Sequence, residues 1–137
     1  MDKNKLNHLI IEFFEKLSSW EHGIVRENEL TLSQMHIIEI LGWHKTLRMK
    51  ELSEKMGVTT GSLTVVVDKL VKKELIERKQ HESDRRSLVV ELTPKGNTYF
   101  LEHNRLHSQL TEEIMLHLTE EENRQLEAIL EKINQVI

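Results

Sequence analysis

Residues Thr59–Lys73, with the sequence TTGSLTVVVDKLVKK, are the stretch of this 137-residue chain that decides its fold. At helical spacing this stretch has an apolar face and a polar face. The predicted apolar face comprises Leu63, Val66, Leu70 and Val71. The polar face comprises Thr60, Ser62, Thr64, Lys69 and Lys72. We therefore expect one side of this helix to pack against the protein and the other to contact a partner.

A shorter amphipathic helix is predicted immediately before it, over Lys50–Met56 (KELSEKM). Gly57 follows, and glycine readily adopts the left-handed conformation with which many helices end. Two short helices joined by a tight turn are typical of a helix-turn-helix, whose second helix enters the major groove of DNA.

A β-hairpin is predicted after the second helix, with strands at Leu75–Lys79 (LIERK) and Ser87–Leu92 (SLVVEL). The second strand alternates, and one of its faces holds Leu88, Val90 and Leu92. Between the strands, Gln80–Arg86 (QHESDRR) forms a polar tip with two adjacent arginines. Helix, turn, helix and basic hairpin in unbroken order indicate a winged helix-turn-helix. The alternative is an ordinary α+β core with a solvated charged loop.

Four phrases of the sequence resemble the MarR family of transcriptional regulators: LTLSQMHIIEIL (30–41), ELSEKMGVTTGSLTVVVDKLVKKELIER (51–78), SDRRSLVVELTPKG (83–96) and LTEEE (118–122). The wing phrase D-x-R, followed by LT-x-x-G, is the most specific part. The resemblance implies a homodimeric DNA-binding regulator, usually a repressor, whose terminal helices form the dimer interface. Arg48 departs from the family pattern, which usually has Thr or Ser there, so the short helix is expected to fray or to be capped differently.

The length and composition indicate one mainly helical domain, with 38% hydrophobic residues, one proline and five glycines. The absence of cysteine excludes disulfides, thiolate ligands and a thiol redox switch. The sequence has no long apolar run and no signal-peptide pattern, so we expect a cytoplasmic protein without membrane contact.

Charge is distributed unevenly along the chain, whose formal net charge is −4. Residues 45–95 contain 12 of the 19 Lys and Arg but only 8 of the 23 Asp and Glu, which makes this segment +4 and its flanks −8. A positive segment between acidic arms suits attraction to phosphates and predicts marked salt sensitivity of binding.

The flanking segments are predicted to be helices with apolar stripes. Thr31 with Gln34, and Thr119 with Glu122, form capping-box patterns, and Pro94 suits a first helical position. The stripes comprise Leu6, Leu9, Ile10, Phe13, Phe14 and Leu17 in the first helix and Leu126, Ile129, Leu130, Ile133 and Ile137 in the last. We predict a single domain over 1–137, mainly α with a small β-hairpin wing. Its DNA-binding module spans about 45–95, and dimerisation helices lie at 1–30 and 97–137.

The predicted DNA contacts follow from this geometry. The first turns of a recognition helix meet base edges, which assigns that role to Thr60, Gly61, Ser62 and Thr64. Phosphate contacts are predicted for Lys69 and Lys72 farther along the helix. In the wing, we expect Arg85 and Arg86 to reach the minor groove, while Asp84 pairs with Arg86 and fixes the wing's shape.

Histidines are frequent, and His103 and His107 are four residues apart on a predicted helix. With Glu102 and with His36 from an earlier helix they are candidate zinc ligands. A zinc-sensing branch of the MarR family is similar in this respect, but a fatty-acid-synthesis regulator branch looks similar too. No cofactor is predicted to be required, and two interpretations of the histidines remain open: a zinc site, or a polar patch at an interface or pocket.

Catalysis is not predicted, because the H-x-x-x-H spacing lacks an internal Glu and no P-loop, G-x-S-x-G or G-x-G-x-x-G is present. We predict a homodimeric repressor that binds a palindromic DNA operator and responds to a small ligand. The ligand pocket is expected near Trp20, His36, Trp43, Tyr99 and His103. One alternative is a zinc-sensing repressor that uses His36, His103 and His107. A remoter alternative is a helical protein-interaction module without DNA binding.

Overall fold

The computed structural model describes residues 1–84 and 86–137 and divides into two compact units, residues 1–100 and 101–137. The first unit contains α1 (Lys3–Glu27), α2 (Leu32–His44), β1 (Thr46–Arg48), α3 (Met49–Met56), α4 (Thr60–Lys72), β2 (Ile76–Gln80) and β3 (Leu88–Leu92). Helix α5 (Pro94–Leu116) begins in the first unit and continues into the second, which also contains α6 (Glu120–Asn134). The predicted class, mainly helical with a small β-hairpin wing, is confirmed.

Local capping signals set the helix ends as predicted. Thr31 Oγ1 accepts a hydrogen bond from the Gln34 backbone N–H at 3.2 Å, and the Gln34 side chain accepts from the Thr31 N–H at 3.0 Å. The same reciprocal box starts α6. Gly57 ends α3 with φ 67° in the left-handed region. At the other end of α3, the Glu51 carboxylate accepts from the Arg48 N–H at 3.0 Å, which confirms that this start is capped differently.

The apolar face of α4 differs from the prediction, which left out Val67. Leu63, Val67 and Leu70 are fully buried, whereas Val66 and Val71 are half-buried at the edge of the core. Spacings of four and three residues keep a seam on one side of a helix with 3.6 residues per turn, so Val67 belongs to it. Because residues 65–67 are all valines, the sequence did not indicate which of the three faces the core.

The sheet has three antiparallel strands in the order β1-β3-β2, and the sequence predicted only the last two. Strand β1 has three residues, too few for a periodic signal. The predicted alternation in β3 is wrong at its start, because Leu88 is exposed while Val89 and Val90 are both buried. Val89 lies directly opposite Arg48 and Lys79 on the neighbouring strands, and the aliphatic stems of such side chains can cover an apolar neighbour.

The start of α5 packs tightly against the turn between α4 and β2. Thr93 Oγ1 accepts from the Gly96 N–H at 3.0 Å and donates to the Glu74 carbonyl at 2.6 Å. A Cβ on Gly96 would lie 1.9 Å from the carbonyl oxygen of Leu75. The LT-x-x-G phrase therefore contains a helix cap and a position where only glycine fits.

Apolar side chains are exposed on α1 in the first unit and on α6 in the second. In α1 they are Leu6, Leu9, Ile10, Ile11, Phe13 and Phe14, each 46–67% exposed. The predicted stripe of α6, from Leu126 to Ile133, is 37–52% exposed. Within the described ranges, no helix combines the length and apolarity that a membrane crossing requires.

Candidate nucleic-acid interface and effector groove

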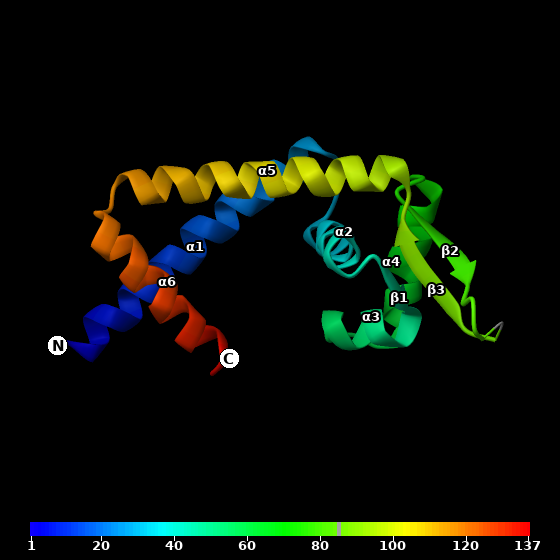
Figure 1. The fold of residues 1–137 in the computed structure, drawn as a ribbon, viewed down its shortest axis with the longest axis horizontal. Helices are drawn as coiled ribbons and strands as arrows, with labels where there is room; N and C mark the ends of the chain where they lie inside the picture. Colours follow the sequence, from blue (N-terminus) through cyan, green and yellow to red (C-terminus); the bar gives the residue numbers. More distant parts are fainter. Residues whose placement is uncertain (85) are drawn as a thin grey trace. The chain divides into compact units, whose positions relative to one another are not determined.

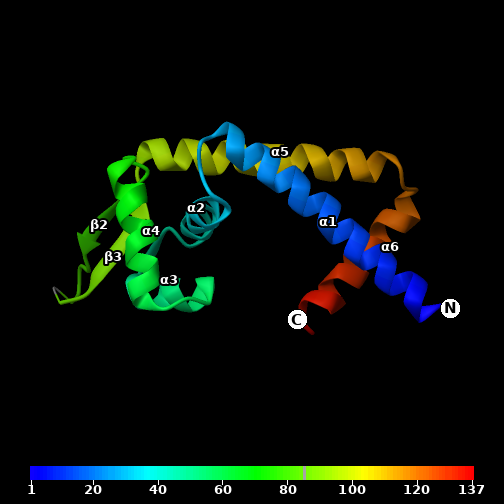
Figure 2. The same ribbon diagram turned by 180° about the vertical axis from the view of Figure 1, so that it is seen from behind.

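The helix-turn-helix consists of α3, the turn at Gly57–Thr59 and α4. Figures 1 and 2 show α3 meeting the N-terminal end of α4, with the β2–β3 hairpin alongside α4. The buried seam of α4 leaves its polar face toward solvent. Every residue predicted to contact DNA from this helix is exposed, namely Thr60, Gly61, Ser62, Thr64, Lys69 and Lys72.

Two of the three predicted hydroxyl contacts are already engaged in hydrogen bonds within the helix. Thr64 Oγ1 donates to the Thr60 carbonyl at 2.8 Å, which leaves it an acceptor toward a partner. Thr59 caps the helix: its Oγ1 accepts from the Ser62 backbone N–H at 3.2 Å and donates to Ser62 Oγ at 3.0 Å. The Ser62 hydroxyl therefore keeps its own proton for an external acceptor.

In the wing, Asp84 fixes the turn, but by different bonds from those predicted. Its carboxylate accepts from the backbone N–H of Arg86 and from the hydroxyl of Ser87, both at 3.0 Å, rather than pairing with the Arg86 guanidinium. These two hydrogen bonds lower the pKa of the Asp84 carboxyl, the Arg86 N–H most. The Arg86 side chain is exposed, and Arg85 lies outside the described residues.

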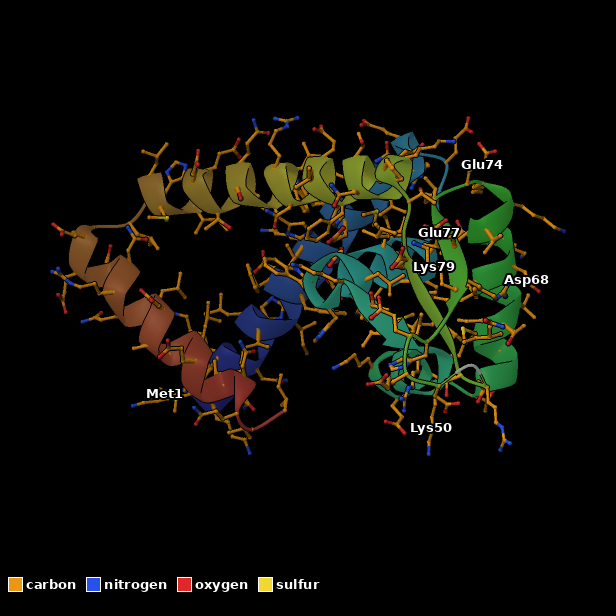
Figure 3. All side chains as sticks on the ribbon, turned by 45° about the vertical axis from the view of Figure 1, so that its right-hand side comes forward. Met1, Lys50, Asp68, Glu74, Glu77 and Lys79 are labelled. Carbon is orange, nitrogen blue, oxygen red and sulfur yellow. The ribbon has the colours of Figure 1, made fainter. Side chains whose placement is uncertain are left out.

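An ion pair joins the recognition helix to the wing. The Asp68 carboxylate of α4 pairs with the Arg78 guanidinium of β2, and Figure 3 labels Asp68 on its helix and Glu77 and Lys79 on the strand. Sequence reasoning missed this pair because Asp68 and Arg78 are ten positions apart on different elements. An acid on the polar face of a basic helix was the only signal available.

A groove lies between α1 and α2, with a volume of about 320 Å³. Its lining is mostly apolar and comprises Phe14, Leu17, Ser18, Glu21, Val25, Leu32, Met35, His36 and Glu39. Of the five predicted pocket residues, only His36 lines it. Trp43 is 69% exposed and lies edge-on to Phe100 with ring centroids 5.6 Å apart, so it covers the core surface instead. Tyr99 packs against the core.

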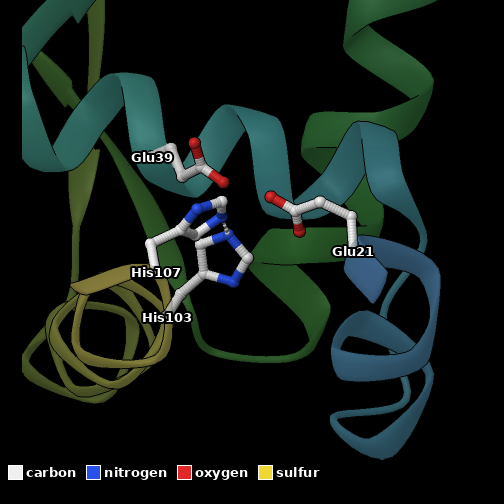
Figure 4. A group of neighbouring side chains, drawn as sticks. All are labelled: Glu21, Glu39, His103 and His107. Atoms are coloured by element: carbon white, nitrogen blue, oxygen red, sulfur yellow. Dashed lines mark hydrogen bonds between the residues drawn. The ribbon is translucent and has the colours of Figure 1, made fainter. Parts of the chain in front are cut away.

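The predicted zinc ligands do not all come together. His103 is buried and His107 half-buried on α5, and their Nε2 atoms lie 3.1 Å apart (Figure 4). Glu102 is exposed and its carboxylate binds Arg105 at 2.6 and 2.9 Å, which lowers the Glu102 pKa. His36 is exposed on α2 at the α1–α2 groove.

A pair of carboxylates that sequence reasoning did not single out lies in the first unit. Glu21 of α1 and Glu39 of α2, both half-buried, have carboxylate oxygens within 4.8 Å of each other. Figure 4 draws this pair as well. The two residues are eighteen positions apart, so only the packing of α1 on α2 brings them together.

Comparisons with known proteins agree with this arrangement. A family model described as "MarR family" matches residues 30–88. The multiple antibiotic resistance protein MarR of Salmonella typhimurium is 31% identical over 129 residues, covering 93% of this chain and 90% of that one. The matches to YfiV and PchR of Bacillus subtilis span only 45% and 63% of those proteins.

Two solved structures share the fold over nearly the whole chain. The crystal structure of Streptococcus pneumoniae FabT in complex with DNA has a TM-score of 0.91 at 27% identity and covers 98% of this chain and 96% of that one. The reduced form of MarR from E. coli has a TM-score of 0.73 at 25% identity, with 97% and 96% covered.

The exposed recognition helix, the wing and these likenesses define the class: a winged-helix transcriptional regulator. More specifically, the chain belongs to the MarR family.

Proposed function

We propose that this protein is a cytoplasmic, homodimeric repressor that binds a palindromic DNA operator and is released by a small effector. The observation that carries the proposal is the outward face of α4, where hydroxyl and lysine side chains are exposed opposite the buried seam Leu63, Val67 and Leu70. Lysines near the C-terminus of α4 supply charge for phosphates, while the N-terminal hydroxyls reach base edges.

The dimer is supported by apolar surface that each unit leaves exposed. The first half of α1 exposes Leu6, Leu9, Ile10, Phe13 and Phe14, and α6 exposes Leu126, Ile129, Leu130 and Ile133. Within each helix, an exposed apolar stripe of this kind marks an interaction site. A two-fold dimer would place two recognition helices on half-sites one helical turn, about 34 Å, apart. Any change in their separation then changes operator affinity.

The effector is proposed to bind the groove between α1 and α2. Its volume of about 320 Å³ is at the lower end of the range for ligand pockets. The lining favours a small, largely apolar molecule, with polar groups at Ser18 and His36 available to orient it. Helix α1 also carries the exposed apolar side chains of the proposed dimer interface, so an occupant of the groove can alter dimer geometry.

A gel shift with the DNA upstream of the protein's own gene tests the central proposal. The wild type is expected to retard this fragment at low salt and to lose affinity steeply as salt is raised. The double variant Lys69→Ala/Lys72→Ala should bind more weakly with a shallower salt dependence. Lys3→Ala/Lys5→Ala, with the same charge change on α1, is the matched control. Equal binding by all three proteins would refute the proposed interface.

A second candidate is zinc sensing, with His103 and His107 holding the ion. What supports it is the 3.1 Å separation of the two Nε2 atoms. Two nitrogens on one tetrahedral zinc ion, each about 2.0–2.1 Å from the metal, lie roughly 3.3 Å apart. The competing interpretation is a hydrogen bond between two neutral imidazoles, one the donor and the other the acceptor.

Metal analysis separates these interpretations. If zinc is the effector, the wild type should bind it stoichiometrically, and the ion should change operator affinity by about 5- to 150-fold. The double variant His103→Ala/His107→Ala should lose both effects while His8→Ala/His117→Ala retains them. Zinc affinity should also fall at acid pH, because ligand imidazoles must be neutral. Operator binding that is identical with zinc and with a chelator would eliminate zinc sensing.

A further inference from the structure

Val65 is the one aliphatic side chain of α4 that is exposed to solvent. It is 57% exposed, whereas Leu63, Val67 and Leu70 of the same helix are at most 1% exposed. An isolated exposed valine usually needs no explanation. Val65, however, lies on the recognition helix, where an exposed side chain can contact DNA.

Val65 lies on the outermost ridge of the helix. At about 100° per residue, the direction opposite the buried seam is occupied by Gly61, Val65 and Lys72. Gly61 precedes Val65 by four residues, one turn, and nothing lies within 4 Å of where its Cβ would be. The ridge is therefore bare at Gly61, and a DNA groove can approach the backbone there until it meets the two methyl groups of Val65.

The polar side chains near Val65 are partly engaged in hydrogen bonds within the protein, so we expect Val65 to contribute to base recognition. Thr64 uses its hydroxyl proton on the Thr60 carbonyl, and the hydroxyl of Ser62 accepts from Thr59. Lys69 and Lys72, farther along the helix, are suited to phosphates, which carry no sequence information. An apolar group at the centre of this face matches one feature of the major groove, the C5 methyl of thymine.

We propose that Val65 recognises a thymine in each operator half-site by packing its methyl groups against the thymine C5 methyl. This rests on the proposed function of binding operator DNA. The contact distinguishes thymine from cytosine by shape and polarity at C5 and C4, and it requires no hydrogen bond from the side chain.

The test uses operators obtained by in vitro selection from a random DNA library with the full-length protein. Each thymine of a half-site is replaced in turn by deoxyuridine, which removes the methyl group and leaves the base pairing unchanged. At one position this should weaken wild-type binding by about fourfold, the loss expected for one buried methyl group. In Val65→Ala the same replacement should have no effect, because the partner methyl groups are absent.

Val66→Ala is the matched control, because Val66 adjoins Val65 but turns its half-buried side chain away from the ridge. It should keep the full deoxyuridine effect, and circular dichroism should show that both variants are folded. The proposal is overturned if no thymine in the operator is sensitive, or if Val65→Ala loses as much affinity on replacement as the wild type. A protein that selects no DNA at all would overturn the proposed function along with it.

Discussion

Asp68 of the recognition helix and Arg78 of the wing form an ion pair, with the Asp68 side chain 50% exposed and that of Arg78 28%. The pair connects the two elements that are proposed to contact different grooves of one DNA duplex. Its main effect is therefore expected on their relative position rather than on stability, since exposed pairs contribute only about 0–1 kcal/mol.

Replacing either partner of this ion pair should weaken operator binding. Arg78→Met and Asp68→Asn should each lower affinity, and the double variant should lose no more than either single one. Charge alone predicts the opposite for Asp68→Asn, which removes a negative group near DNA. Fluorescence anisotropy with labelled operator provides the measurement. Lys16→Met, which breaks the surface pair with Glu12, is the control and should bind like the wild type. Tighter binding by Asp68→Asn would contradict a positioning role.

The sheet carries a pH-dependent contact around Lys79. Glu77 and Glu91 lie directly opposite each other on β2 and β3, and the Lys79 ammonium pairs with both carboxylates. Lys79 lowers the pKa of Glu91, and both carboxylates raise the pKa of Lys79, with the hydrogen bond to Glu91 as the largest single cause. A lowered carboxyl pKa stabilises the fold above the unfolded value of about 4.3, and that contribution is lost as the pH falls through the folded value. A raised lysine pKa stabilises below about 10.4, and that contribution is lost as the pH rises through the folded value.

Lys79→Met should therefore unfold at a lower urea concentration than the wild type at pH 7. The two proteins should converge as the pH falls through the lowered pKa of Glu91, because the protonated carboxyl no longer pairs with Lys79. Glu77→Gln in the Lys79→Met background should restore part of the loss, because it removes the repulsion across the strands. A difference that persists unchanged at pH 3 would show that Lys79 acts through packing of its stem.

Two glycines should respond to alanine in opposite ways. Gly96→Ala places a methyl group against the backbone carbonyl of Leu75 and should lower the free energy of unfolding by about 1–3 kcal/mol. Gly61→Ala fills open space in a helix and should raise the free energy of unfolding by about 0.5–1 kcal/mol. Gly61→Ala should nonetheless bind operator more weakly, because its methyl group occupies the bare part of the α4 ridge. Denaturant titrations and gel shifts measure the two effects. Tighter DNA binding by Gly61→Ala would refute the close approach.

The assembly is tested on α6. Ile133→Glu places a charge in the exposed apolar stripe and should yield monomers that bind operator poorly, because the two half-sites are no longer engaged together. Ala128→Glu introduces the same side chain on the opposite side of the helix and should remain dimeric. Analytical ultracentrifugation measures the oligomeric state of both variants. A wild type that is monomeric and binds a single half-site tightly would disprove the dimer.

In the wing, Arg86→Ala should weaken operator binding by about 1–3 kcal/mol and reduce the salt slope by about one. The fold should be unchanged, because Asp84 binds the backbone N–H of residue 86 rather than its side chain. Arg85→Ala is expected to weaken binding as well. Arg124→Ala, which removes a paired arginine from α6, serves as the control. Unaltered binding by both wing variants would exclude the wing from the DNA contact.

The sequence by itself determined the elements whose signals are local. The capping boxes at Thr31 and Thr119, the left-handed Gly57 and the start of α5 at Pro94 all occur as predicted. Each depends on neighbouring residues only, through a capping side chain, the backbone freedom of glycine or the missing N–H of proline, so short-range chemistry suffices. The same holds for the polar face of α4, which the 3.6-residue period places opposite its buried seam.

Tertiary structure alone decided the features that join distant residues. Strand β1 exists only because Thr46–Arg48 pairs with β3, and Val67 rather than Val66 is buried because of what packs against α4. Likewise, the Asp68–Arg78 pair, the Glu21–Glu39 pair and the α1–α2 groove arise where separate helices and strands meet. Such contacts depend on the crossing angles and distances of packed elements. No periodicity within one segment encodes those quantities, because they result from the free energy of the whole core.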